Sequence, residues 1–301
     1  MLYKPRTKPK ELMILELLDK RTDLTSKEKQ YYFSLKKGYE GEKLFDTFTE
    51  KLQCDCLILN DLLFEVSNTT FQIDSLIMMP ENIYLYEVKN LEGDYYYQSD
   101  RLFKKPKREI VNPLIQVSRF ETLLRQLIHS LGFNPQINAS VVFINPEFTL
   151  YQAPMDKPFI LPTQINRYLG NFDKKPSKLT AKHKKLAEQL VALHQIESPY
   201  SKLPPYSYDQ LQKGITCSEC QNFAVKVDKR KCRCHVCGYS ESVTNAVLRA
   251  IKEFQVLFPN NRITTNIIYD WCHIVETKYP IRRILADNFN VAGKNQWTYY
   301  E

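Results

Sequence analysis

Apolar residues recur every three or four positions over residues 10–20 and again over residues 25–52, a spacing typical of amphipathic helices. Gly38 and Gly41 interrupt the second segment. Because glycine weakens a helix interior, we expect two helical pieces joined near these glycines. The second piece would bury an apolar stripe that consists of Leu44, Phe45, Phe48 and Leu52.

The pattern then changes to runs rich in β-branched and aromatic residues, which predict strands. Three strands are expected at residues 56–65, 71–79 and 83–90, followed by a hairpin over 93–105. A strongly amphipathic helix should begin at Pro113 and end at Gly132. Strands at 138–146 and 157–162 and helices within 163–171 and 179–197 complete this part. The order predicts an α/β fold, an α/β/α sandwich around a mixed sheet, for a first domain over residues 1–197.

A segment rich in proline and tyrosine, residues 198–213, interrupts this order and is expected to be a linker. Beyond it, helices are predicted over residues 242–258, 262–275 and 279–289, before a glycine-turned hairpin over 290–300. Residues 241–301 would therefore form a small helical module, either winged-helix-like and DNA-binding or a cap that packs on its neighbours.

Composition adds modest constraints. The chain has 301 residues, of which 43% are hydrophobic and 25% charged, as in ordinary globular proteins. No apolar run reaches the roughly 20 residues that a membrane helix needs. Glu11, Glu16 and Asp19 break the apolar part of the basic N-terminus, which is unlike a signal peptide. We therefore expect a cytoplasmic protein without a membrane partner.

The formal net charge of +8 is compatible with a polyanionic partner such as nucleic acid. Basic residues cluster over 101–109, 173–185 and 226–233, and each cluster could face phosphates or simply be solvated. Candidate phosphate contacts in the first cluster and in the C-terminal module are Arg101, Lys104, Lys105, Arg282, Arg283 and Lys294.

Cysteines concentrate in one short stretch. Cys217-x-x-Cys220 and Cys234-x-x-Cys237 are separated by thirteen residues. Thiolates spaced in this way on two tight turns converge on one tetrahedral ion, so residues 214–240 are predicted to form a zinc ribbon with structural Zn²⁺. Cys232 leaves one alternative open, because it could replace Cys234 as a ligand.

Charged residues also occur where buried strands are predicted. Asp74 lies inside one apolar strand, and Glu87 and Lys89 end the next, after the break at residues 80–82. If these strands pair antiparallel, the two carboxylates converge on an oxygen-rich site for Mg²⁺ or Mn²⁺, to which the carbonyl of Val88 could add a ligand. A lysine beside such an ion suits phosphodiester hydrolysis. The alternative is an exposed ion pair between Glu87 and Lys89.

Asp74…Glu87-x-Lys89 resembles the signature of the PD-(D/E)XK nucleases, the restriction-endonuclease-like superfamily. More specifically, residues 10–170 resemble the NERD (nuclease-related domain) family. Residues 38–48, GYEGEKLFDTF, match its Gly-x-x-Gly-Glu helix, and Gly93 matches a glycine at the turn after the strands. Asn112-Pro113-x-x-Gln116 matches its Asn-Pro-x-x-Gln helix start. The order of these motifs is more specific than any one of them.

The resemblance implies roles for individual residues. Asp74 and Glu87 would bind the metal, Glu42 would reach it directly or through water, and Lys89 would orient water and stabilise the transition state. Gln116 would face the active site or cap the sheet edge.

The expected function is metal-dependent hydrolysis of phosphodiester bonds, with DNA as the expected substrate. The C-terminal modules would bind nucleic acid. The alternative is a catalytically silent nucleic-acid-binding or assembly protein of a DNA-processing or mobile-element system. Because many nucleases of this fold pair up, a homodimer is left open.

Overall fold

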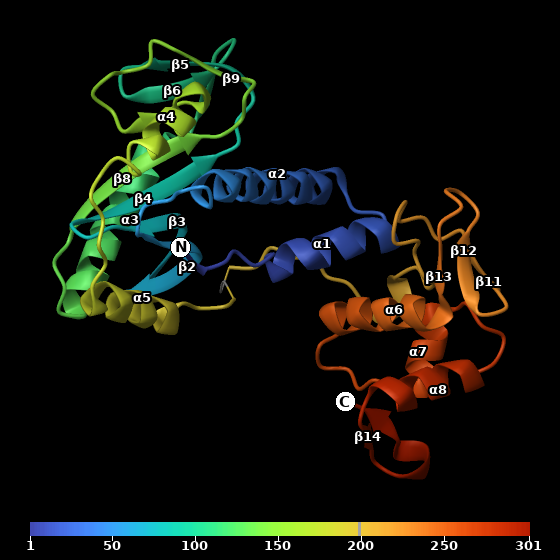
Figure 1. Cartoon of the computed structure of the whole chain (residues 1–301). Coiled ribbons are helices and arrows are strands. Elements are labelled where there is room, and N and C mark those ends of the chain that lie inside the picture. The colour runs from blue at the N-terminus through green and yellow to red at the C-terminus, as the bar shows by residue number, and fades with distance from the viewer. Residues whose placement is uncertain (198–199) are drawn as a thin grey trace. The chain divides into compact units, whose positions relative to one another are not determined.

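The computed structural model describes residues 1–197 and 200–301. The chain forms two compact units, and each is interrupted in sequence. The first consists of Met1–Lys8 and Phe33–Tyr200, and the second of Pro9–Tyr32 and Ser201–Glu301. The helix α2 (Ser26–Thr49) therefore contributes residues to both units (Figure 1). The N-terminal helix region expected within the first domain belongs instead to the second unit.

The main sheet of the first unit has the strand order β1-β2-β3-β4-β8-β10. Strands β2, β3 and β4 pair antiparallel, whereas β1 pairs parallel with β2, and β4, β8 and β10 pair parallel with one another. The predicted mixed sheet is thus confirmed. Its strands are β1 (Leu2–Lys4), β2 (Leu57–Val66), β3 (Thr69–Met78), β4 (Asn82–Lys89), β8 (Gln136–Phe143) and β10 (Phe159–Ile160).

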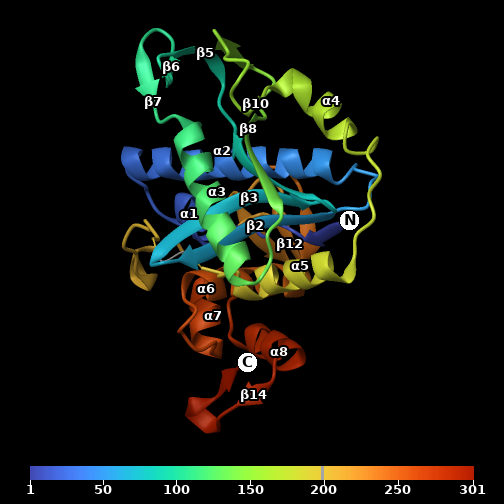
Figure 2. The same cartoon turned by 90° about the vertical axis from the view of Figure 1, so that its left-hand side faces the viewer.

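Helices cover both faces of this sheet (Figure 2). Apolar residues of α3 (Pro113–Ser130) and α5 (Ala181–Leu193) join the hydrophobic core on one face. Residues of α2 and α4 (Ile165–Gly170), including Phe45 and Leu169, join a second core on the other face. The α/β/α arrangement follows because both faces of a largely apolar sheet must be shielded from water.

The same unit also contains a smaller sheet, with the strand order β7-β6-β5-β9. It contains β5 (Gly93–Gln98), β6 (Arg101–Lys104), β7 (Arg108–Ile110) and β9 (Phe148–Tyr151). Ser99 and Asp100 have φ angles of 50° and 57° and form the tip of the predicted β5–β6 hairpin. Strands β7 and β9 were not expected from the sequence, because each is only three or four residues long.

The expectation of two helical pieces near Gly38 and Gly41 is wrong, because α2 is one continuous helix. The cost of a glycine in a helix is only about 1 kcal/mol, which the surrounding residues of a long packed helix outweigh. Glu42 consequently lies in the C-terminal half of α2 rather than near a helix start.

The second unit is built around α1 (Lys10–Arg21) and α6 (Val243–Leu257), with α7 (Thr265–Cys272) and α8 (Tyr279–Asn288) beside them. A small antiparallel sheet has the order β11-β12-β13, with bounds Val225–Asp228, Lys231–Cys234 and Ser240–Ser242. The C-terminal hairpin joins β14 (Val291–Ala292) to β15 (Tyr299–Tyr300) across the short 3-10 helix Asn295–Trp297. The helices predicted over residues 242–258, 262–275 and 279–289 agree in position with α6, α7 and α8, although α7 is shorter than predicted.

The segment expected to be a linker is largely packed. Ser198 and Pro199, its first two residues, lie outside the described residues. Farther along, the hydroxyl of Tyr206 donates to the carbonyl oxygen of Leu257 at 2.9 Å, and that of Tyr208 donates to Asp270 at 2.6 Å. Leu211 is buried in the core of the second unit. The described part of this segment is therefore attached to that unit.

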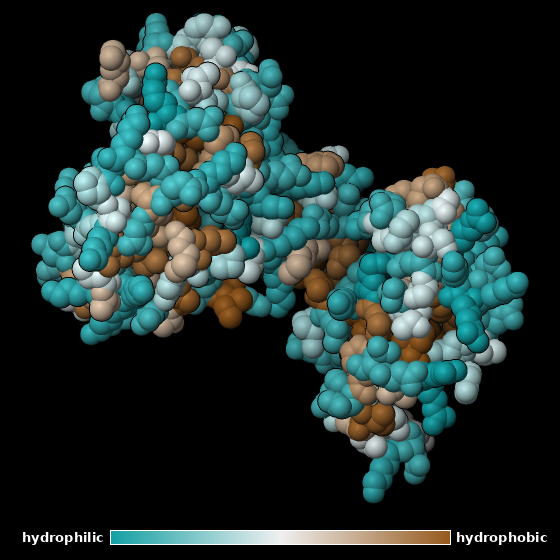
Figure 3. Space-filling view, viewed as in Figure 1, coloured by the Kyte–Doolittle hydropathy of each residue, from teal (hydrophilic) through white to brown (hydrophobic). Residues whose placement is uncertain are grey.

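Among the described residues, no helix is both long enough and apolar enough to span a bilayer. In the view of Figure 3 the surfaces of both units are mainly hydrophilic, with hydrophobic residues in scattered patches.

Candidate functional site

Asp74 and Glu87 meet at one end of the β3–β4 ladder. The last paired residues of this ladder are Ser75 and Tyr86, and Asp74 and Glu87 are the next positions in the same antiparallel register. Directly opposed residues of an antiparallel pair point to the same face. The predicted convergence of these two side chains on neighbouring strands therefore agrees with the pairing, and both residues are buried.

The backbone of Val88 contributes to the position of Asp74. The Val88 N–H donates to Oδ2 of Asp74 at 2.7 Å. The carbonyl of Lys89, one residue on, accepts from the N–H of Ile144 and so faces β8. Because successive peptide groups of a strand point to opposite sides, the carbonyl of Val88 faces the β3 side, together with its N–H. This oxygen thus faces the side of β4 on which the strand that carries Asp74 lies.

Lys89 lies between Glu87 and the first turn of α3. Its Nζ donates to Oε1 of Glu87 at 2.6 Å and to Oε1 of Gln116 at 3.1 Å. Asn112 caps α3 by accepting from the N–H of Leu114 at 3.0 Å, and Pro113 occupies the first turn. The Asn-Pro start thereby fixes the helix so that Gln116 reaches the lysine.

Burial controls the electrostatics of the carboxylates. Desolvation, followed by the nearby charge of Asp74, raises the pKa of Glu87 to about 8, although Lys89 opposes the shift. Desolvation also raises the pKa of Asp74 against the opposing effects of Lys89 and the Val88 N–H. The two carboxyl groups are therefore held together at a place where burial and mutual repulsion favour their protonated forms.

Glu42 lies near this pair but is held by a cation of the protein. Nη1 of Arg6 is 2.6 Å from Oε2 of Glu42, and Arg6 also binds both carboxylate oxygens of Asp46, at 2.9 and 3.0 Å. Burial, followed by the charge of Asp74, raises the pKa of Glu42 to about 8, although Arg6 opposes the shift. Among the described residues, the carboxylates of Glu42, Asp74 and Glu87 do not form one compact set of ligand atoms.

Sequence reasoning missed Arg6. Its Nη2 also donates to the carbonyl oxygen of Asp74 at 2.7 Å, so this arginine joins α2 to β3. Its partners lie 36 to 68 positions away in sequence. No local pattern in the short N-terminal segment could indicate such distant contacts.

The four cysteines predicted to bind zinc come together. The sulfur atoms of Cys217, Cys220, Cys234 and Cys237 all lie within 4.8 Å of one another, so they could hold one metal ion. Backbone N–H groups, first that of Cys237 and then that of Val236, lower the pKa of the Cys234 thiol to about 6. Cys232 is instead buried in the hydrophobic core of the second unit. The arrangement favours Cys234 over Cys232 as the fourth ligand.

The candidate phosphate contacts are all exposed but are spread over both units. The side chains of Arg101 and Lys105 project from one face of the β5–β6 hairpin. That of Lys104 projects from the other face, beside the ring of Tyr95. In the second unit, Arg282 and Arg283 lie on α8, and Lys294 precedes the short helix of the C-terminal hairpin. Arg283 lies 3.7 Å from Asp287, one turn along α8.

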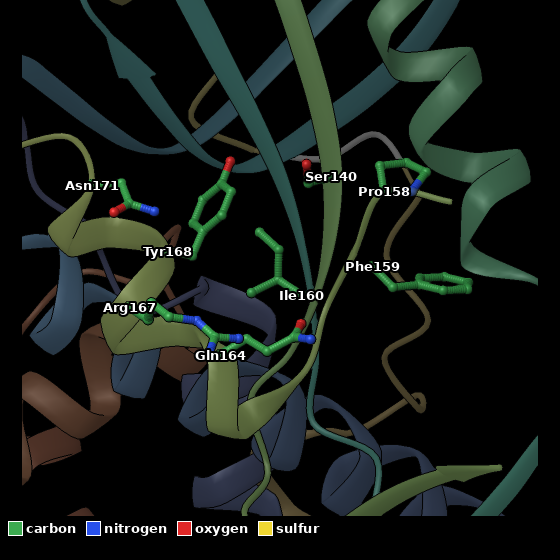
Figure 4. A pocket seen from close by; sticks show the side chains of 8 residues that line it. All are labelled: Ser140, Pro158, Phe159, Ile160, Gln164, Arg167, Tyr168 and Asn171. Atoms are coloured by element: carbon green, nitrogen blue, oxygen red, sulfur yellow. The ribbon is translucent and has the colours of Figure 1, made fainter. Parts of the chain in front are cut away.

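A cavity of about 240 Å³ lies elsewhere on the first unit. Figure 4 shows its lining, which includes Ser140 of β8 and Arg167 and Tyr168 of α4. Ser140 pairs with Tyr86 in the sheet, and Tyr86 belongs to the core on the α2 and α4 side. None of the predicted catalytic residues lines this cavity, so it is separate from the carboxylate site.

Comparison with protein families identifies part of the chain. Residues 37–144 match the model of the family described as NERD, nuclease-related domain. The match is shorter than the segment 10–170 suggested by the motifs, but it contains Glu42, Asp74, Glu87, Lys89 and Gln116. Searches of curated proteins and of solved structures found no match.

Proposed function

Because residues 37–144 of this chain belong to the nuclease-related domain family, we propose that the protein is a metal-dependent nuclease that hydrolyses phosphodiester bonds in DNA. The observation that carries the proposal is the position of Lys89, bound to Glu87 and Gln116 beside the buried Asp74. A lone surface ion pair would not need a second buried carboxylate opposite it in the sheet. The cluster is better explained by chemistry than by stability.

The residues fit a divalent cation. Asp74, Glu87 and the carbonyl of Val88 offer hard oxygen ligands, which Mg²⁺ and Mn²⁺ prefer. One oxygen of Asp74 accepts from the Val88 N–H, and the other remains for a ligand. A cation here would also offset the repulsion between the buried carboxylates. When bound, such an ion would lower the pKa of an attacking water and screen the phosphate.

The remaining steps belong to side chains of the protein. The Lys89 side chain is 29% exposed, so its ammonium would be able to meet a phosphate while Glu87 and Gln116 hold it in place. Its charge would stabilise the negative charge that develops on the phosphate oxygens in the transition state. Glu42, held by Arg6, would contribute negative charge near the ion or bind it through water.

We further propose that the cysteine cluster binds structural Zn²⁺ and that the second unit helps to bind nucleic acid. Four thiolates within reach of one ion are the usual ligand set of a closed structural zinc site. The exposed Arg282, Arg283 and Lys294 would contact phosphates without reading sequence.

Cleavage of labelled single-stranded, duplex and branched DNA, and of RNA, with added Mg²⁺ or Mn²⁺ tests the nuclease. Asp74→Asn and Lys89→Ala should each lower the rate about a hundredfold or more, since each removes a group that acts on the reacting phosphate or its ion. Glu121→Gln, which alters only an exposed helical ion pair with Arg125, is the matched control and should leave the rate unchanged.

Two outcomes would overturn the proposal. In one, no substrate is cut with either metal although the protein binds DNA in a salt-dependent manner, which would identify a silent binding protein. In the other, cleavage occurs but survives both active-site substitutions, so that the activity resides elsewhere.

A further inference from the structure

The small sheet of the first unit carries a row of aromatic side chains on its outer face. In its register Tyr96 of β5 is opposite both Phe103 of β6 and Tyr151 of β9. Directly opposed residues share a face, so the three rings form one row across three neighbouring strands. The rings of Tyr96 and Phe103 stack, with centroids 5.0 Å apart and planes inclined by 11°.

Alternation along the strands shows that this row is not the core side. Tyr95, Tyr97 and Leu102, the alternate positions, are buried in the main core of the unit. By contrast, Tyr151 is 44% exposed, and Tyr96 and Phe103 are partly exposed. Three adjacent aromatic rings facing water on one sheet are unusual, because the solvent face of a half-buried sheet is normally polar.

Positive charge borders the aromatic row. Nζ of Lys105 lies 3.6 Å from the centroid of the Tyr151 ring. Arg101 projects from the same face at the other end, where it lies 3.4 Å from Glu109, the residue of β7 opposite Phe103. The segment 101–109, which forms β6, the following turn and the first two residues of β7, contains five basic residues and one acidic residue. Asp94 is the acidic side chain on this face nearest Lys105 in the register.

We propose that this face, defined by Tyr96, Phe103, Tyr151, Arg101 and Lys105 and here called the aromatic platform, binds single-stranded nucleic acid by stacking bases on its rings. Aromatic rings on a four-stranded sheet and a positive border are the combination that accepts unpaired bases and their phosphates. A duplex would not fit, because its bases are already stacked and cannot lie on the rings. The inference rests on the proposed nuclease and specifies its substrate as a single strand or an unpaired region.

The aromatic platform is connected to the candidate active site by short segments. β5 begins four residues after Lys89. The N–H of Ile144 donates to the carbonyl of Lys89 at 3.1 Å, and that of Gly93 donates to the carbonyl of Glu147 at 2.9 Å, so the connections from β4 and β8 run together. Figure 1 shows both strands leading into the small sheet. Tyr96 lies seven positions after Lys89, which limits the distance between their Cα atoms to about 25 Å.

The alternative is that the rings only stabilise the sheet through cross-strand contacts. Binding measured without added Mg²⁺ or Mn²⁺ separates the two, because it does not require cleavage. The probes are fluorescein-labelled oligothymidylate, oligouridylate and an oligothymidylate–oligoadenylate duplex, titrated with the full chain. Tyr96→Leu and Phe103→Leu remove a ring but retain an apolar side chain of similar bulk, and Tyr96→Phe retains the ring.

We expect Tyr96→Leu and Phe103→Leu each to weaken binding of a single strand about fivefold to a hundredfold, as the loss of one base–aromatic stack does. Tyr96→Phe should bind as the unmodified protein does, and duplex binding should change less than twofold in all variants. Thr149→Ala, on the same face without a ring, is the matched control and should have no effect.

Unchanged single-strand binding in both leucine variants would overturn the proposal that the aromatic platform binds single strands. An equal loss of affinity for the duplex and for the single strand would also overturn it. Neither result depends on whether the protein cuts DNA. Conversely, a protein that never cuts but shows the expected pattern would refute the nuclease and retain the single-strand site.

Discussion

Nη1 of Arg6 lies 2.6 Å from Oε2 of Glu42, although the two residues are 36 positions apart and only Glu42 lies within the matched family segment. The same guanidinium binds Asp46 through two of its nitrogens and the carbonyl of Asp74 through one. Its side chain is 3% exposed. The N-terminal segment thus supplies a buried cation that holds α2 against the strand carrying a candidate metal ligand.

Arg6→Met should lower the free energy of unfolding by about 3–5 kcal/mol, because it leaves the buried carboxylate of Asp46 and the partly buried one of Glu42 without their cation. Arg6→Lys should recover only part of this loss, since a lysine cannot make the bidentate contact with Asp46. Urea unfolding followed by circular dichroism measures both. Arg125→Ala, which breaks an exposed pair with Glu121, should cost only about 0.5 kcal/mol. A loss below 1 kcal/mol for Arg6→Met would contradict this account.

Gly41 and Gly38 should respond oppositely to alanine, although both lie in α2. A Cβ at Gly41 would be 2.5 Å from Cβ of Asn90, the residue after Lys89, whereas one at Gly38 would meet nothing within 4 Å. Gly41→Ala should therefore destabilise the protein by about 1–3 kcal/mol through overpacking. Gly38→Ala should stabilise it by about 0.5–1 kcal/mol, because alanine favours the helix. Urea unfolding compares the two, and equal shifts of the same sign would refute the close approach of α2 to Asn90.

Elemental analysis of the purified chain should find about one zinc ion per molecule. Cys234→Ala should lose the ion, because a tetrahedral site cannot close with three thiolates from this cluster. Cys232→Ala should retain it, since that side chain is buried in the core away from the other sulfurs. The reverse result, with zinc kept by Cys234→Ala and lost by Cys232→Ala, would show that Cys232 and not Cys234 is the fourth ligand.

Gln116 should act as a positioning residue for Lys89. Gln116→Ala removes an acceptor 3.1 Å from Nζ of the lysine, which leaves the ammonium free to swing away from the phosphate. For the proposed nuclease we expect kcat to fall about tenfold with little change in KM, since the lysine acts mainly in the transition state. Ile115→Ala alters an exposed neighbour in the same turn and is the control. A change in KM alone would assign Gln116 to substrate binding instead.

Local sequence patterns predicted most of the secondary structure and the family whose model matches residues 37–144. The strands that carry Asp74 and Glu87 were predictable because their apolar runs are long and a break at Pro80 separates them. The cysteine ligand set was predictable because each pair lies on one tight turn, so its geometry depends on adjacent residues alone. The continuous α2 was not, because a packed helix tolerates glycines that weaken an isolated one.

The sequence by itself therefore determined the candidate catalytic residues, the cysteine cluster and the mixed α/β class of this protein. Only the tertiary structure decided that Arg6 holds Glu42, that Gly41 lies against Asn90, and that Tyr96, Phe103 and Tyr151 form one exposed row. Each of these contacts joins residues brought together by strand register or helix packing. Such contacts depend on the free energy of the whole fold, so no local pattern of residues specifies them.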